Sequence, residues 1–163
     1  MIKNKIWYEF LNFKFGDDYL ILYINRQRKI RNYFKIATII LSCSGIWSAY
    51  KELKYPSIIA FVIITIVQIF TSIESYLIHS EKDIDDLCEL RNRYYSHWNE
   101  LENLWHKSPN YNENELTDKF YELREQSKKI EELDNKLGIK KIKNLVNKAD
   151  KSTRTYIKIY NNE

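Results

Sequence analysis

The sequence predicts an all-α membrane protein, with a two-helix transmembrane hairpin between an N-terminal amphipathic helix and a C-terminal cytoplasmic helical region. The chain has only three Gly and two Pro in 163 residues, and scarce turn formers favour long helices over short strands. Two apolar runs lie between positions 36 and 78, and apolar residues then recur at helical spacing. The expected domains are residues 1–35, 36–78 and 79–163.

Residues 17–34 are expected to form the amphipathic helix. Gly16 precedes this segment, and Asp17 or Asp18 can cap its first turn. The helix can lie along the membrane surface or continue directly into the first span. Its basic cluster, RQRKIR at 26–31, adjoins an apolar run, which favours contact with anionic lipid over nucleic acid. The residues expected to contact lipid headgroups are Arg26, Arg28, Lys29, Arg31 and Lys35.

Two apolar runs are interpreted as membrane spans. Residues 36–50 hold fifteen uncharged residues, fewer than the roughly 20 of a typical span, but Lys35 and Lys51 can extend the run by reaching toward headgroups. Residues 55–73 contain no charge, and residues 58–67 are apolar on nearly every side. Such a helix lies in lipid or is wholly buried. Because a chain of this size can hardly enclose two of them, we expect a membrane hairpin rather than a buried one.

Charge predicts the orientation of this hairpin. Residues 1–35 carry eight Lys or Arg and three acids. Basic flanks stay in the cytoplasm, so both termini are expected to be cytoplasmic, with the short loop between the spans outside.

Polar and small residues within the two runs are the candidate site. Polar groups in a span face other helices or water, and two interpretations stay open: the two helices pack against each other, or an oligomer turns the polar face toward a lumen. The candidate pore-facing or helix-packing residues are Thr65, Gln68, Ser72, Glu74 and Ser75. Small residues that allow close helix approach are Ser44, Gly45, Ser48 and Ala49.

The C-terminal region carries a heptad-like seam. Its members alternate at spacings of three and four, with Arg91 as the one polar position. Residues 108–115 break the pattern, and a second helical stretch ends at Gly138, which fits a C-terminal cap. A third stretch covers residues 139–160, and the helices can pair within one chain or between chains. The seam residues are Ile84, Leu87, Tyr94, Trp98, Leu101 and Trp105.

The sequence contains no catalytic signature. His79, His97 and His106 lack metal-ligand spacing, and Cys43 and Cys88 form no paired motif. Gly-rich phosphate-binding motifs and a nucleophile elbow are also absent from the sequence. We therefore expect no enzyme, no cofactor and no metal.

The segments RNYFKIATIILSCSGIWSAYKELKYPSIIAFVIITIV and LRNRYYSHWNELENLW give the chain an arrangement that resembles the SLATT family of two-transmembrane proteins. The resemblance covers about residues 17–160. It implies an effector of bacterial anti-phage defence, which oligomerises in the inner membrane and permeabilises or disrupts it during abortive infection. It also implies a trigger, either a partner sensor protein or a nucleotide second messenger.

A second function remains open. Because seams are present and catalytic chemistry is not, the chain could be a non-enzymatic membrane anchor or scaffold that recruits a cytoplasmic partner through its C-terminal helices. In both interpretations the partners include the lipid bilayer, a homo-oligomer is expected, and direct nucleic-acid binding is not.

Overall fold

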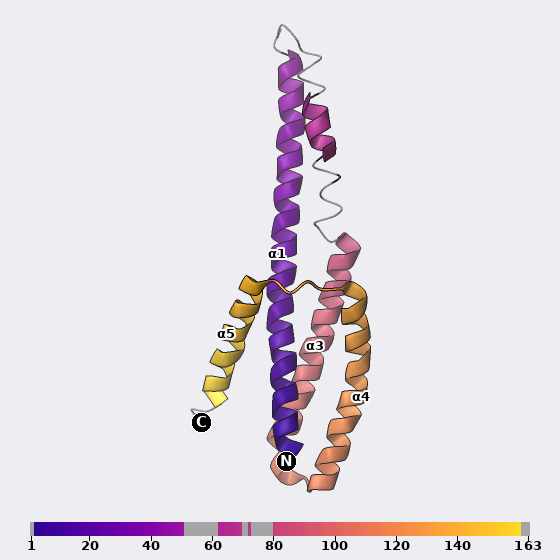
Figure 1. The fold of residues 1–163 in the computed structure, drawn as a ribbon, viewed down its shortest axis with the longest axis vertical. Coiled ribbons are helices and arrows are strands. Elements are labelled where there is room, and N and C mark those ends of the chain that lie inside the picture. The colour runs from indigo at the N-terminus through magenta and orange to yellow at the C-terminus, as the bar shows by residue number, and fades with distance from the viewer. Residues whose placement is uncertain (1, 51–61, 70–71, 73–79, 161–163) are drawn as a thin grey trace. The chain divides into compact units, whose positions relative to one another are not determined.

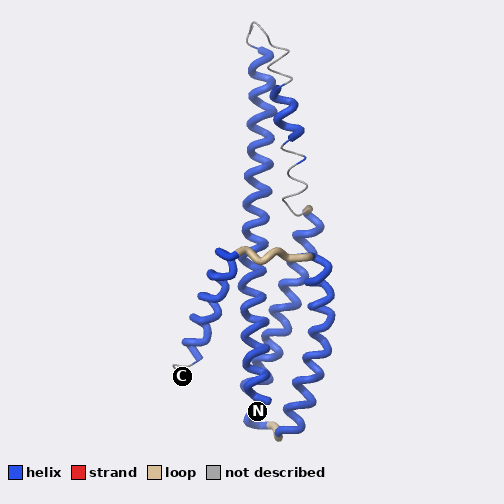
Figure 2. The backbone as a smooth tube through the Cα atoms, viewed as in Figure 1, coloured by secondary structure: helices blue, strands red, loops and turns tan. Residues whose placement is uncertain are grey.

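A computed structural model describes residues 2–50, 62–69, 72 and 80–160 of the chain. Figures 1 and 2 show that the described residues are mostly helical, with a loop between α4 and α5, and the described residues include no strand. The elements are α1 (Ile2–Tyr50), α3 (Glu81–Lys107), the 3-10 helix η1 (Ser108–Asn110), α4 (Glu113–Leu137) and α5 (Lys143–Tyr160). Residues 62–69 are also helical.

The predicted transmembrane hairpin is contradicted by the described helices. Within the described ranges, none of the helices is both long enough and apolar enough to cross a membrane. The predicted fold class, an all-α membrane protein with two spans, is therefore wrong, although the described chain is helical. The predicted location, an inner membrane crossed twice with both termini cytoplasmic, is overturned by the same finding.

The physical reason lies in α1. Its apolar end, residues 36–50, is no separate element but continues a helix that carries five bases between positions 26 and 35. Fifteen uncharged residues, several of them Ser or Thr, fall short of the roughly 20 predominantly apolar residues that a span needs. Of the second run, the structure describes residues 62–69 and Ser72.

The expected helix start near Gly16 is also wrong. Helix α1 begins at Ile2 and continues through Gly16, Asp17 and Asp18 without a break. A Cβ at Gly16 would lie 2.3 Å from Cε1 of Tyr94, so the missing side chain makes room for a ring of α3. This glycine therefore serves helix packing and does not precede a helix.

The chain divides into two compact units. The first, which we call the bundle, comprises Met1–Ile24 and Asp85–Glu163, and the second comprises Asn25–Ile84.

Aromatic and aliphatic side chains form the core of the bundle. Trp7 near the start of α1 meets Trp105 near the end of α3 at 5.1 Å between ring centroids, whereas Phe13 meets Tyr94 at 5.2 Å, so α1 and α3 are antiparallel. The chain reverses at η1, and α4 returns beside them (Figure 1). Burying one such side chain is worth about 1.5–3 kcal/mol, which makes this cluster the main source of bundle stability. The buried cluster consists of Ile2, Ile6, Phe10, Leu101, Leu104, Leu116 and Phe120.

Local hydrogen bonds fix both ends of α4. The Asn112 side chain accepts from the Glu115 N–H at 2.9 Å, while the Glu115 carboxylate accepts from the Asn112 N–H at 3.2 Å, which is a capping box. The predicted cap at Gly138 is confirmed: its φ is 55°, and its N–H donates to the Asp134 carbonyl at 3.1 Å. The loop that follows leads to α5.

The second unit is described through parts of α1, residues 62–69 and the start of α3. Arg31 forms an ion pair with Glu81 at 2.6 Å, and Lys35 lies 3.9 Å from the same carboxylate. Exposed apolar side chains in this unit include Tyr33, Ile36, Ile39 and Ile40 of α1, and Val62, Ile64, Ile66 and Ile69.

Candidate functional site

Charge in the C-terminal region is separated by helix. Residues 139–160, which include α5, carry seven bases and one acid, whereas residues 82–136 carry nine bases and fourteen acids. A count over the whole region gives near neutrality and hides this contrast, although a count for each helix reveals it from sequence alone. The seven bases are Lys140, Lys141, Lys143, Lys148, Lys151, Arg154 and Lys158.

Helix α5 turns its uncharged side toward the other helices of the bundle. Leu145, Ala149 and Thr153 are buried, while Lys148 and Lys151 are exposed. The Thr153 hydroxyl lies 3.1 Å from the Ala149 carbonyl and 3.4 Å from an Asp18 carboxylate oxygen of α1. The helix therefore docks through small and apolar side chains and leaves its bases on the outside.

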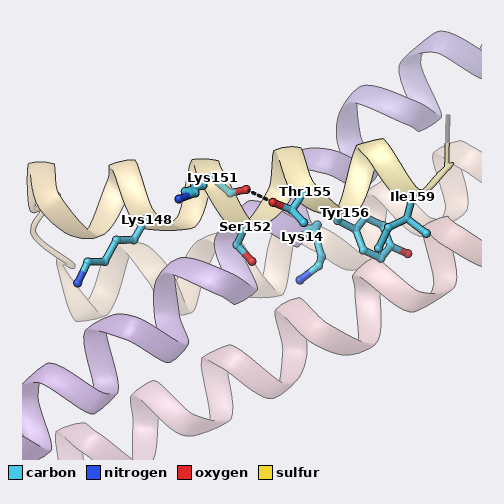
Figure 3. A pocket seen from close by; sticks show the side chains of 7 residues that line it. All are labelled: Lys14, Lys148, Lys151, Ser152, Thr155, Tyr156 and Ile159. Carbon is cyan, nitrogen blue, oxygen red and sulfur yellow. Dashed lines mark hydrogen bonds between the residues drawn. The ribbon is translucent and has the colours of Figure 1, made fainter. Parts of the chain in front are cut away.

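A groove of about 480 Å³ runs along one side of α5 (Figure 3). Its Tyr156 and Ile159 combine with three lysines, and Ile159 is 58% exposed. Lysine stems and apolar side chains can cover the body of a bound segment while the ammonium groups meet its charges. The lining residues are Lys14, Lys148, Lys151, Ser152, Thr155, Tyr156 and Ile159.

Contacts with α1 and α3 hold one wall of this groove in place. The Tyr156 hydroxyl donates a hydrogen bond to Glu102, and the Tyr156 ring lies 5.7 Å from the Trp98 ring. Lys14 forms an ion pair with Asp18 at 2.6 Å, and its Nζ lies 4.9 Å from the centroid of the Trp98 ring. A wall fixed in this way loses little conformational entropy when a ligand binds.

The polar position in the predicted seam has a structural partner. Arg91 Nε donates to the buried carboxylate of Asp17 at 2.7 Å, linking α3 to α1. Burial raises the pKa of Asp17, and the Arg91 guanidinium opposes that shift. Asp17 lies 74 residues before Arg91 in the sequence. The spacing of the seam residues alone therefore gives no reason for a polar residue at this position.

Of the remaining seam residues, Ile84 belongs to the second unit and the others belong to the bundle. Ile84, Leu87 and Leu101 are buried, and the aromatic members Tyr94, Trp98 and Trp105 are partly buried. Trp98 and Trp105 contact the core cluster of the same chain. Burial of His97, which the seam omitted, lowers its pKa to about 4.

Several predicted site residues lie in the second unit. Thr65, Gln68 and Ser72 are exposed, whereas Glu74 and Ser75 lie outside the described residues. The side chains of the small-residue set, Ser44, Gly45, Ser48 and Ala49, also lie outside the described part, although α1 includes their backbone.

Among the residues expected to contact lipid headgroups, Arg26, Arg28, Lys29 and Lys35 are exposed and Arg31 is partly buried. Over the ranges that the structure covers, no group of His, Cys, Asp and Glu could hold a metal ion.

No known family, curated protein or solved structure matches this chain. The resemblance to the SLATT family, the expected homo-oligomer and the expected sensor therefore stay predictions. The groove beside α5 is the described feature that best combines exposure, charge and apolar surface.

Proposed function

We propose that this chain is a non-enzymatic recruitment module that binds an acidic, amphipathic segment of a protein partner along the groove of α5. The observation that carries the proposal is the combination of Lys148 and Lys151 with Tyr156 and Ile159 in one exposed groove. Such an exposed face supports one part of the anchor-or-scaffold interpretation of the sequence, the recruitment of a partner through the C-terminal helices, and the membrane anchor is not part of this proposal. The membrane-effector interpretation needs two spans, which the described helices do not supply.

The chemistry of the groove favours an acidic helix over other partners. Lysine side chains reach carboxylates as flexible point charges, and the excess of bases on α5 would steer an acidic segment toward the groove. Ile159 offers apolar surface that a phosphate backbone does not use but that a Leu or Ile of a partner helix would cover. An amphipathic segment satisfies both properties together.

Binding of a synthetic peptide to the full chain tests the proposal. The probe is a fluorescent helical peptide with Glu on one face and Leu on the other, and the control peptide carries Lys in place of each Glu. At physiological ionic strength, fluorescence anisotropy should detect the acidic peptide and not the basic one. The double variant Lys148→Glu, Lys151→Glu should weaken binding by at least about tenfold, because each change replaces attraction by repulsion.

A matched variant and a second ligand make the outcome decisive. Lys129→Glu with Lys136→Glu changes the charge equally on exposed positions of α4 and should alter the affinity by less than about threefold. Equal loss in both double variants would show a general charge effect and reject the groove. Tighter binding of a single-stranded DNA oligonucleotide, with a steep salt dependence, would reject a protein partner.

A further inference from the structure

A second cavity lies within the bundle, and residues from all four of its α-helices line it. Its volume is about 400 Å³, and its walls come from α1, α3, α4, the loop after α4 and the start of α5. Cavities that bind small molecules span about 300–1,000 Å³, so this one suits a single small ligand.

Aromatic rings form its walls. Phe15 and Tyr19 of α1 are stacked, with ring centroids 6.3 Å apart and an interplanar angle of 23°. The Tyr19 hydroxyl donates to the Lys140 carbonyl at 2.6 Å and accepts from the Ile142 N–H at 3.1 Å. These two bonds tie the loop after α4 to α1, so the rings and the loop form one preorganised wall.

The third ring, Tyr94, reaches the cavity across Gly16. Because any Cβ at Gly16 would overlap this ring, glycine is what allows the aromatic side chain to lie against the backbone of α1. The Tyr94 hydroxyl donates to Oδ2 of Asp134 at 3.1 Å. Burial, together with the Asp134 carboxylate, raises the pKa of Tyr94, so the phenol stays protonated and keeps this bond.

Two opposite charges complete the cavity. Asp134 of α4 contributes a carboxylate, and across the described chain it forms no ion pair. Lys141, from the loop, contributes an ammonium group. A ligand with a cationic group, an anionic group and a flat apolar body would satisfy Asp134, Lys141 and the rings together.

We infer that this cavity binds a free aromatic α-amino acid. The ligand ammonium pairs with Asp134, its carboxylate pairs with Lys141, and its ring packs among Phe15, Tyr19 and Tyr94. Aromatic pairs prefer stacked or edge-to-face contacts, which walls at several angles can supply. The inference is independent of the groove of α5, because the two cavities share no lining residue.

Titration of the full chain with four related probes tests the assignment. L-tryptophan carries both charges, tryptamine lacks the carboxylate, indole-3-propionate lacks the amine, and glycine lacks the ring. Amide NMR shifts should report L-tryptophan binding with a Kd below about 1 mM, and each of the other three should bind at least about tenfold more weakly. Absence of L-tryptophan binding in this range, or binding of tryptamine or indole-3-propionate as tight as that of L-tryptophan, would overturn the inference.

Matched variants locate the ligand. Asp134→Asn keeps an acceptor for the Tyr94 hydroxyl but removes the negative charge, and Lys141→Gln removes the positive charge. Each variant should weaken L-tryptophan binding at least about tenfold. The circular dichroism spectrum should stay unchanged, which shows that the variants fold. Glu132→Gln and Lys140→Gln are nearby controls whose side chains do not line the cavity, and they should change the affinity by less than about twofold. Binding that tolerates Asp134→Asn and Lys141→Gln would place the ligand elsewhere and reject the site.

Discussion

His97 should make the bundle sensitive to acid. Its residue surface is only 3% exposed, its ring lies 4.3 Å from the Phe13 ring, and within the described chain its Nε2 has no hydrogen-bond partner. Burial disfavours the imidazolium and lowers the pKa of His97 from 6.5 to about 4. The folded bundle therefore keeps this histidine neutral at pH values where an unfolded chain protonates it.

The sign and size of the effect follow from linkage. Between pH 6.5 and pH 4 the unfolded chain binds a proton that the folded chain does not, so the free energy of unfolding falls as the pH falls. The contribution is fully present above pH 6.5. The lowering of the His97 pKa from 6.5 to about 4, at 1.36 kcal/mol per pKa unit, corresponds to about 3 kcal/mol, most of which is lost by pH 4.5.

The variant His97→Phe isolates this contribution, because it keeps a planar ring beside Phe13 and removes the titrating group. Urea unfolding followed by circular dichroism at pH 7.5 and pH 4.5 measures both proteins. The free energy of unfolding of the wild type should fall by about 2–3 kcal/mol more than that of the variant between these pH values. Glu9 and Asp17, whose pKa values burial raises, act in the opposite direction, but they are common to both proteins and cancel in the difference. A difference below about 0.5 kcal/mol would refute the argument that burial keeps His97 neutral.

Three substitutions test other contacts by the same urea unfolding at neutral pH. Gly16→Ala should destabilise the bundle by about 1–3 kcal/mol, since the new Cβ meets the Tyr94 ring; a gain in stability would mean that the ring moves freely away. Gly138→Ala should cost about 1–2 kcal/mol through its left-handed backbone alone, because nothing lies within 4 Å of the new Cβ, and an unchanged midpoint would argue against that conformation. Arg91→Met should lower the free energy of unfolding by about 3–5 kcal/mol, because it leaves the Asp17 carboxylate buried without its partner. The additional change Asp17→Asn should recover part of this loss. No recovery would show that the buried charge is not the cause.

Local patterns predicted the helices better than they predicted the contacts between them. The cap at Gly138 was predictable because its cause, the end of one helix, lies within a few residues. Arg91 was not interpretable from the seam, because its partner Asp17 lies on another helix. Gly16 was taken for a boundary for the same reason: the ring that requires it belongs to a residue 78 positions later, Tyr94.

The candidate groove was missed for a different reason. Residues 82–163 carry sixteen bases and sixteen acids, so the excess of bases in residues 139–160 cancels the excess of acids before it in a count over the whole region. The apolar runs led to a different error, in which a feature was predicted that the structure does not contain. A run of fifteen uncharged residues suggested a separate span, but α1 continues through it from a charged segment. A hydropathy value describes only the residues of one window, whereas α1 extends beyond that window into charged residues.

The division of the bundle between the two ends of the sequence also governs when it can form. Residues 1–24 leave the ribosome before the rest of the bundle, and 60 residues of the second unit, Asn25–Ile84, must be made before the first part of α3 in the bundle appears. At about 5–20 residues per second, this interval lasts roughly 3–12 s, during which Ile6 and Phe10 have none of their α3 or α4 core neighbours. Contacts between such distant segments also slow the search for the native arrangement, since a long loop must close first. During synthesis, the first part of α1 therefore exposes apolar side chains until α3 and α4 have been made. The bundle can be completed only after the final third of the chain, which contains α4 and α5, has been synthesised.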